Sequence, residues 1–368
     1  MHRSVWRDPG ERRSTRRLAA LCGVVCVLAL SACNPIYVIR VGWAEAKILR
    51  SRVPLTEVMT DPAVGLPVRA KLRLVWDARA FAVAELGFQN TGESYTSLAR
   101  LESDTLALVL TAAYRDRLEF RTWWFPVTGR IPYRAYFSTQ AGERARDELE
   151  DEGYDTYLRP TAAFSTLGWF ADPLYSTLLR LDEVALVETV LHELAHNHLY
   201  VPGEGRFNES FANFAGHVAA IQFFCRSTVG GPVTVRCQRA RDRWADAQDI
   251  SRFIDSLEVA VVDLYRGRGD STVEALMGRR EAVFQAARDD FISRVQPGLR
   301  ATTYEYLATE PLNNATLLSR SLYFHRLPEF EALSQDWDGG FVDLLQWLRS
   351  QAGELDDPFD TLEVGRPS

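Results

Sequence analysis

The sequence predicts an α+β fold, with a strand-rich first half and a mainly helical second half. Runs rich in β-branched and aromatic residues, separated by turn residues, lie between residues 95 and 170. Long amphipathic runs follow from residue 181 onward. Strands that precede helices, rather than alternate with them, are typical of the α+β class. The 368 residues, of which 46% are hydrophobic and 25% charged, exclude a disordered or collagen-like chain.

The first 32 residues have the pattern of a secretory signal. Basic residues between positions 12 and 17 precede the apolar run 18–30, which is shorter than the roughly 20 residues that a membrane-spanning helix needs. The run ends in Leu-Ser-Ala-Cys, which resembles the bacterial lipobox, whose cysteine is lipidated and becomes the first residue of the mature chain. We therefore expect lipidation of Cys33, with a plain signal peptide or an uncleaved anchor as the alternatives.

A lipid on Cys33 would hold the mature chain on the periplasmic face of a bacterial membrane, because several acyl chains together give stable anchoring. Asn34 is not the acidic residue often linked to inner-membrane retention, so the outer membrane is favoured. The formal net charge is -7, and removal of the signal, with its six arginines and two acids, leaves 36 basic and 47 acidic residues. Such an acidic chain lacks the basic surface that nucleic acids need, so no nucleic-acid partner is expected.

The cysteines divide between the signal and the mature chain. Cys22 and Cys26 lie in the signal, and Cys33 takes the lipid. Cys225 and Cys237 remain, in an oxidising compartment, on either side of a Gly-Gly-Pro turn. We expect a disulfide that closes a hairpin-like loop, with two free thiols as the alternative.

The expected elements follow the hydrophobic pattern along the chain. Helices are predicted over 36–52 and 67–87, the second because Val68, Leu72 and Val75 share one side. The strand-rich part is predicted to contain strands over 95–101, 105–114, 118–125 and 133–137, a charged helix over 140–152, and a strand over 161–170. The later helices are predicted over 181–200, 208–224, 238–266 and 273–294, with shorter pieces to about residue 350.

Nothing in the composition divides the mature chain, which has no internal repeat and no low-complexity linker. We therefore predict one domain over residues 33–355, after the signal of residues 1–32, with residues 356–368 as a flexible tail. No pattern in the sequence predicts an oligomeric state.

Three of the six histidines lie within the segment HELAHNH, which begins at His192. Residues four apart project from one face of a helix, so His192 and His196 can bind one metal ion. Glu193 lies about 100° further around the helix and can hold a water on that ion. An apolar stripe that includes Val187 and Leu191 buries the helix. A surface helix with two unrelated histidines is the alternative.

A third ligand is predicted at Glu209, in the segment Asn-Glu-Ser-Phe-Ala that follows the histidines. Catalytic zinc takes three protein ligands and keeps one position open. Gly203 and Gly205 let the chain turn back, so Glu209 can face the two histidines. The segment is similar to the third-ligand segment of gluzincin metallopeptidases. The alternative for Glu209 is an acid favoured in the first turn of a helix by the helix dipole.

Other polar residues compete for places around the ion. His198 points to another face of the helix, and His217 is expected to pack or form hydrogen bonds near the site rather than to bind the metal. A metzincin would have its third histidine at Pro202, so that class is excluded. Asn213 stands where many gluzincins have an aspartate that orients the first histidine. Its amide can accept the imidazole N–H but contributes no negative charge.

With these motifs, the chain resembles a bacterial family of predicted aminopeptidases of the zincin superfamily, in lipoprotein form. The resemblance rests on the segments Gly129–Phe137, Ser165–Leu174 and Leu312–Ala315, together with HELAH and NESFA. It implies a zincin-like, gluzincin-type fold in which a mixed sheet with an edge strand precedes the HExxH helix. The segment 161–170 lies where that edge strand would receive an extended peptide, with an ordinary core strand as the alternative.

The assignments predict peptide-bond hydrolysis with one Zn²⁺ per chain, held by the three predicted ligands. Glu193 is expected to act as general base and then to pass the proton to the leaving amine. A further donor should stabilise the oxyanion, and Tyr323 is the candidate, with Tyr304 and Tyr306 as competitors.

The resemblance implies an aminopeptidase, which releases N-terminal residues from a peptide substrate. Such an enzyme also needs an acid for the substrate amine, and the sequence offers Glu188 and Glu204 without favouring either. The alternatives are an envelope endopeptidase with the same mechanism and a non-catalytic lipoprotein that binds peptides. Glu193 argues against the second, because a binding protein needs no general base.

Overall fold

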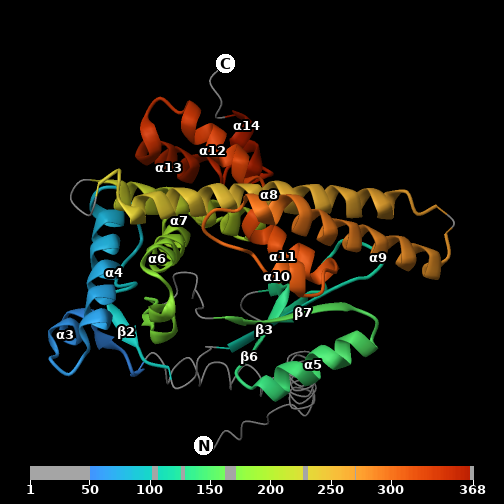
Figure 1. Cartoon of the computed structure of the whole chain (residues 1–368), viewed down its shortest axis with the longest axis horizontal. Helices are drawn as coiled ribbons and strands as arrows, with labels where there is room; N and C mark the ends of the chain where they lie inside the picture. The colour runs from blue at the N-terminus through green and yellow to red at the C-terminus, as the bar shows by residue number, and fades with distance from the viewer. Residues whose placement is uncertain are drawn as a thin grey trace, which may run out of the picture.

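The computed structural model describes residues 50–101, 107–125, 129–161, 171–226, 231–269 and 271–364. The signal with Cys33 and almost all of the segments 36–52 and 161–170 lie outside these ranges, and so do the predictions made for them. Within the described ranges, no helix is both long and apolar enough to cross a membrane. The described chain is α+β, as predicted, with small sheets in its first half and helices in its second (Figure 1).

The N-terminal part of the described chain forms one side of the molecule. Strand β1 (Val53–Pro54) leads into helix α3 (Leu55–Thr60), which is followed by the longer helix α4 (Leu66–Ala84). A proline in its first turn starts α4, where no backbone N–H is needed. The helix buries Leu72 and Val75 as predicted, largely against the helix that carries His192, whereas Val68 on the same predicted side is exposed.

The strands of the described residues form three small sheets. Strand β3 (Ala107–Ala113) is the centre of an antiparallel sheet, with β6 (Tyr133–Tyr136) on one side and β7 (Asp155–Thr161) on the other. Helix α5 (Thr139–Asp151) covers it, as Figure 1 shows. Strands β4 (Trp123–Phe125) and β5 (Gly129–Ile131) form a hairpin. The third sheet joins β1 antiparallel to β2 (Ser97–Ala99), and β2 parallel to β8 (Leu174–Tyr175).

The prediction of one mixed sheet was therefore wrong for the described residues. Only the sheet β1-β2-β8 is mixed, and its strands are two or three residues long. The predicted strand 118–125 is broken because residues 115–118 bend, and only Trp123–Phe125 pairs as a strand. Strand β7 was missed. Its Pro160 has no N–H to donate and argues against a strand, but β7 lies at the edge of its sheet, where proline is tolerated.

The second half contains the long helices. Helix α6 spans Glu183–His198, α7 spans Gly205–Cys225 and α8 spans Val235–Arg266. Helix α8 runs the width of the molecule, and α9 (Val273–Asp290) lies beside its far half (Figure 1). Helix α11 (Asn314–Phe324) packs against both α7 and α8. The shorter segments are η1 (Ser176–Arg180), η2 (Phe291–Val295), η3 (Gln296–Gly298), α10 (Tyr306–Thr309), α12 (Leu327–Asp336), α13 (Gly340–Gln351), η4 (Pro358–Asp360) and α14 (Thr361–Val364).

The main hydrophobic cluster surrounds α6 and α7 and extends to the C-terminal helices. Residues 356–364, predicted as part of a flexible tail, belong to it. They form η4 and α14, and the side chains of Phe359 and Leu362 are buried. The ring of Phe359 packs edge-on against Phe207 in α7. Phe359 and Leu362 therefore dock this short segment on the core, together with the buried Pro358 and Thr361.

A disulfide joins Cys225, the last residue of α7, to Cys237 in the first turn of α8. The sequence predicted this pair. The closed loop connects two helices rather than two strands. It ties α7, which carries Glu209, to α8, which carries Arg243.

Candidate active site

Helix α6 is placed by its N-terminal cap. The side chain of Asp182 accepts hydrogen bonds from the backbone nitrogens of Val184 and Ala185, at 3.0 and 3.1 Å. Burial acts to raise the pKa of Asp182, but the bond from Ala185 and the charge of Arg239 outweigh it and lower the pKa overall. A charged acid therefore caps the helix at the end where the dipole favours negative charge.

The turn between α6 and α7 is held by Asn208. Its side-chain oxygen accepts from the backbone nitrogen of Val201 and its side-chain nitrogen donates to the Val201 carbonyl, both at 2.8 Å. Gly203 in this turn has a φ of 90°, which a residue with a side chain rarely adopts. Asn208 is itself buried, and the next residue along α7 is Glu209. The asparagine before the predicted ligand therefore fixes the path by which Glu209 returns to α6.

Gly216 lets the two helices approach closely. A Cβ atom on this residue would lie 2.9 Å from the backbone nitrogen of His192 and 3.0 Å from the carbonyl oxygen of Glu188. Contacts this short essentially do not occur, so only glycine fits here. Helices α6 and α7 accordingly form the most extensive helix pair of the described chain.

The structure brings the three predicted ligands together. The Nε2 atoms of His192 and His196 are 3.2 Å apart, and Oε2 of Glu209 lies 3.4 Å from the first and 3.5 Å from the second. These three residues form a group able to hold a metal ion. The rings of the two histidines are almost perpendicular, so both Nε2 atoms point to the same place from successive turns of α6.

Electrostatics favour a charged carboxylate at this place. Burial acts to raise the pKa of Glu209, but the charges of the two histidines and their hydrogen bonds hold it well below its usual range. Burial is the largest single effect on the pKa of His196 and acts to lower it, but Glu209, with smaller contributions from Glu193 and Asp172, raises the pKa overall. Glu209 therefore stays ionised and can offer a full negative charge to a cation.

Tyr323 lies beside the predicted ligands, as the sequence suggested. Its ring stacks on that of His192, with centroids 6.2 Å apart, and the Nη2 atom of Arg159 lies 3.5 Å from its hydroxyl. The negative charge of Glu209, together with burial, raises the pKa of Tyr323, so the phenol keeps its proton and can donate. Tyr304 and Tyr306 instead pack edge to face against each other in a second hydrophobic cluster.

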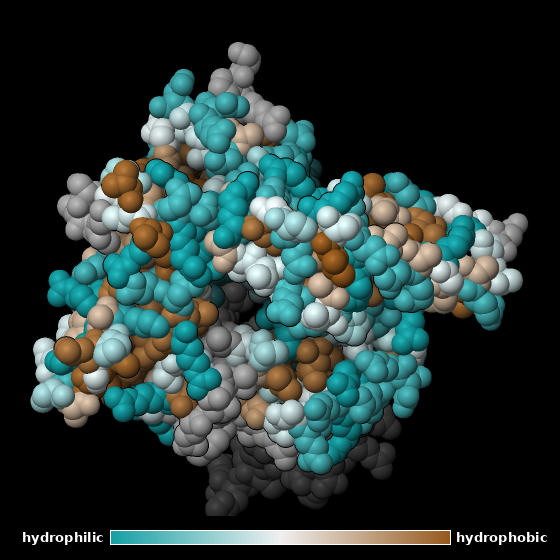
Figure 2. Space-filling view, viewed as in Figure 1, coloured by the Kyte–Doolittle hydropathy of each residue, from teal (hydrophilic) through white to brown (hydrophobic). Residues whose placement is uncertain are grey.

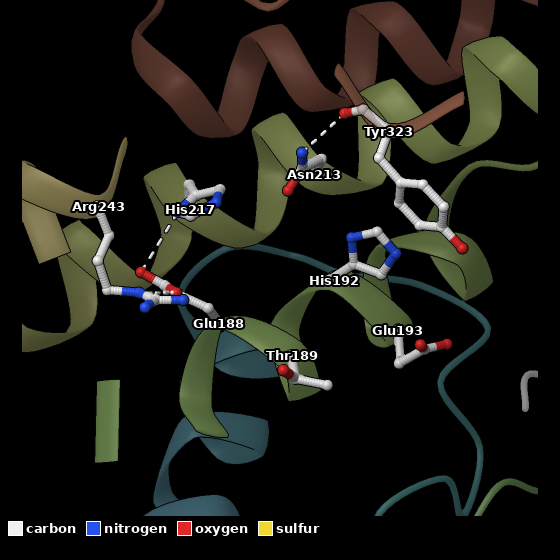
Figure 3. Close-up of a pocket in the computed structure, with 8 residues that line it drawn as sticks. All are labelled: Glu188, Thr189, His192, Glu193, Asn213, His217, Arg243 and Tyr323. Atoms are coloured by element: carbon white, nitrogen blue, oxygen red, sulfur yellow. Dashed lines mark hydrogen bonds and ion pairs between the residues drawn. The ribbon is translucent and has the colours of Figure 1, made fainter. Parts of the chain in front are cut away.

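A cavity of about 260 Å³ opens beside His192. Figure 3 shows Tyr323, His192 and Glu193 at one end and Arg243 with Glu188 at the other. The surface view shows a hollow below α8, between α6 and α11, the helices that carry His192 and Tyr323 (Figure 2). The lining residues are Glu188, Thr189, His192, Glu193, Asn213, His217, Arg243 and Tyr323.

The remaining polar residues have other partners. His198 points away from the cavity, stacks on Phe88 and accepts a hydrogen bond from the backbone nitrogen of Gln89. His217 lies near the site, as predicted, with its Nδ1 atom 3.3 Å from Glu188. Asn213 lines the cavity, but its side-chain nitrogen donates to the backbone oxygen of Tyr323. Within the described residues it makes no hydrogen bond to His192, the role the sequence suggested.

A second group, Asp255, Glu258 and His325, could also hold a metal ion by the spacing of its atoms. Its members already have partners. Nδ1 of His325 is 2.7 Å from Asp255, and Glu258 pairs with Arg206 and accepts from Ser321. This group fastens α8 to the end of α11. In the group of His192, His196 and Glu209, by contrast, the three ligand atoms lie 3.2 to 3.5 Å from one another.

Sequence reasoning missed Thr189, Arg159 and Arg243. Thr189 is one turn before Glu193 on α6, so helix periodicity alone could have placed it on the cavity side. Arg159 and Arg243 come from β7 and α8. Nothing in the sequence near either residue marks it as part of the site, because only tertiary packing brings these elements to α6.

The ligand atoms of His192, His196 and Glu209 converge on one point. Glu193 lines the cavity beside them. This arrangement is a candidate centre for metal-assisted hydrolysis. Residues 36–356 match the family model Aminopep, described as "Putative aminopeptidase", and the chain belongs to this family. No curated protein and no solved structure matches the chain. The family suggests a peptidase.

Proposed function

We propose that the protein is a zinc-dependent aminopeptidase with a zincin-like catalytic core. The observation that carries the proposal is the triangle of ligand atoms, with sides of 3.2, 3.4 and 3.5 Å. Ligand atoms about 2.1 Å from a tetrahedral ion lie about 3.4 Å from one another. Two imidazoles with one carboxylate form a ligand set that suits zinc and leaves one position open.

The chain's own residues supply the proton transfers. A bound zinc ion would polarise the scissile carbonyl and lower the pKa of a water. Glu193 lines the cavity next to His192, so it is placed to take the proton of the attacking water and return it to the leaving amine. The Tyr323 phenol, which stays protonated, is placed to donate a hydrogen bond to the oxyanion.

Substrate cleavage tests this proposal. Fluorogenic aminoacyl amides should be hydrolysed, whereas internally quenched peptides with blocked N-termini should not. The reverse preference would indicate an endopeptidase of the same mechanism. Binding of both without cleavage, in protein that contains one zinc per chain by elemental analysis, would indicate a peptide-binding lipoprotein and overturn the proposal.

We also propose that a lipid on Cys33 holds the enzyme on the periplasmic face of a bacterial membrane, with the outer membrane favoured. The support is the lipobox-like sequence that ends at Cys33. Cys33→Ser should release the protein from washed membranes or leave it with its signal uncleaved. Mass spectrometry of the N-terminus distinguishes the two, and unchanged fractionation would remove the lipid from the proposal.

A further inference from the structure

The end of the cavity opposite Tyr323 contains a group of charged residues that the proposed mechanism does not use. Glu188 lies one turn before His192 on α6, His217 comes from α7 and Arg243 from α8. All three line the cavity (Figure 3). Glu188 and His217 are more than nine-tenths buried. Buried charges are costly unless they are paired. The atoms of this group that already have partners are therefore not free for a ligand, and those without partners are the candidates for binding one.

Both carboxylate oxygens of Glu188 already face other groups. Its Oε2 atom accepts a hydrogen bond from Nε of Arg243 at 2.5 Å. Its Oε1 atom is buried and lies 3.3 Å from Nδ1 of His217. Glu188 therefore has no oxygen exposed to the cavity, and it is not placed to bind the amine of a substrate. Its position beneath the guanidinium instead fixes the orientation of Arg243.

Arg243 differs from Glu188, because only some of its N–H groups have hydrogen-bond partners. The bond to Glu188 engages Nε, and within the described part of the chain no hydrogen bond engages its two Nη groups. The side chain keeps 18% of its surface accessible and borders the cavity. The two Nη groups, which carry four N–H donors between them, therefore remain at the cavity end.

We propose that the Nη groups of Arg243 bind a carboxylate of the peptide substrate, with Glu188 as the positioning residue. The inference rests on the proposed peptidase function and names a feature of its substrate. A planar guanidinium matches a carboxylate with two parallel hydrogen bonds. The cavity of about 260 Å³ is small beside the roughly 300–1,000 Å³ typical of ligand pockets. A short peptide segment at His192 therefore brings its charged groups close to the walls.

Two kinds of carboxylate have this chemistry: the free C-terminus of a dipeptide and the side chain of an acidic residue. Two substrate pairs separate them. The first pair is alanyl-alanine and alanyl-alanine amide. The second is alanyl-glutamyl-alanine amide and its glutaminyl counterpart. The zinc-loaded protein should prefer the carboxylate member of one pair by about 10- to 100-fold in kcat/KM, as expected for hydrogen bonds between charged groups.

The variants assign the preference to Arg243. Arg243→Gln alone leaves Glu188 buried without its partner and so endangers folding. The double variant Glu188→Gln/Arg243→Gln removes both charges, so that no buried carboxylate is left without its partner. It should abolish the preference, so that kcat/KM becomes equal for the two members of each pair. Arg241→Gln is the matched control, because Arg241 is exposed on the same helix, and it should leave the preference unchanged.

Calorimetry measures the affinity of the Glu193→Gln protein for the same four peptides. This affinity does not depend on turnover. The carboxylate member of the same pair should bind about 10- to 100-fold more tightly, and the double change at residues 188 and 243 should remove this difference. Equal affinity within both pairs, no measurable binding, or a preference that survives the double change overturns the inference. Tighter binding of a carboxylate by a protein that cleaves none of the peptides would instead refute only the proposed peptidase function.

Discussion

Gly216 in α7 faces His192 in α6 so closely that a Cβ atom at this position would lie 2.9 Å from the His192 backbone nitrogen. The same helix pair carries all three predicted metal ligands. The close approach of α6 and α7 at Gly216 therefore also sets the distances between the ligand atoms.

Gly216→Ala tests this relationship. The methyl group must push α7 away from α6, so we expect a loss of about 1–3 kcal/mol in the free energy of unfolding, as for other overpacked cores. Metal content per chain should also fall, because Glu209 moves with α7. Urea denaturation and elemental analysis measure the two effects.

The control uses the same substitution where there is room. Gly278 lies in α9, and a Cβ atom added to it would meet no other atom within 4 Å. Gly278→Ala should stabilise the protein by about 0.5–1 kcal/mol, because alanine is the better helix former. Destabilisation by both substitutions would mean that the close approach at Gly216 is not the cause.

Glu193→Gln should separate catalysis from metal binding. The amide cannot accept the proton of the attacking water, so the rate should fall by about 10²- to 10⁴-fold. Because Glu193 is not one of the three predicted ligands, metal content should not change. Glu183→Gln, at the exposed start of the same helix, is the comparison. Full activity of the Glu193 variant would exclude it as the base.

Glu209→Ala should lower metal occupancy, because it leaves two histidines to hold the ion. The alternative ligands near the site are His198 and His217. His198 stacks on Phe88, away from the predicted ligands, so His198→Gln should leave the metal content unchanged. His217→Gln should do the same, since its Nδ1 atom faces Glu188. Elemental analysis of the three dialysed proteins decides, and full occupancy in the Glu209 variant would transfer the ligand role elsewhere.

Asn208→Ala removes both hydrogen bonds to Val201 and leaves the Val201 N–H without its partner, whereas the Val201 carbonyl still accepts from the backbone nitrogen of Glu204. A loss of about 1–3 kcal/mol in the free energy of unfolding is expected, the cost of buried polar groups left unsatisfied. Asn197→Ala, on α6, is the comparison, because within the described residues its side chain makes no hydrogen bond. If both variants unfold at the same urea concentration, the turn does not depend on Asn208.

Asp182 gives a pH dependence with a definite sign. Its pKa is lowered in the folded state, so its charge stabilises the fold above the usual pKa of about 3.9, and this stabilisation is lost as the pH falls through the folded value. Asp182→Asn keeps an acceptor at the cap but removes the charge. We expect it to be less stable by about 0.3–1 kcal/mol at pH 7.

Urea unfolding of both proteins between pH 3 and 7 checks the prediction for Asp182. The two stabilities should converge towards the acidic end. A difference that stays constant over the whole range would show that the charge of Asp182 does not contribute through its altered pKa.

The parts of the site that lie on one helix could be predicted from the sequence. His192, Glu193 and His196 are related by the helical repeat alone, and Glu209 follows after a short turn. Arg243 could not be found in this way, because its place depends on how α8 crosses α6 and α7. The split of the strands into three sheets was missed for a similar reason: partners of two- and three-residue strands are chosen by packing, not by alternation.

The covalent link between Cys225 and Cys237 has a mechanical consequence for the arginine. Along a helix, Arg243 lies about 9 Å from Cys237, whereas Arg266 at the other end of α8 lies about 43 Å away. If α8 tilts about the disulfide, the displacement of each residue grows with its distance from Cys237. The guanidinium would then move about one fifth as far as the distal end of α8, so the disulfide favours a fixed position of Arg243 beside Glu188.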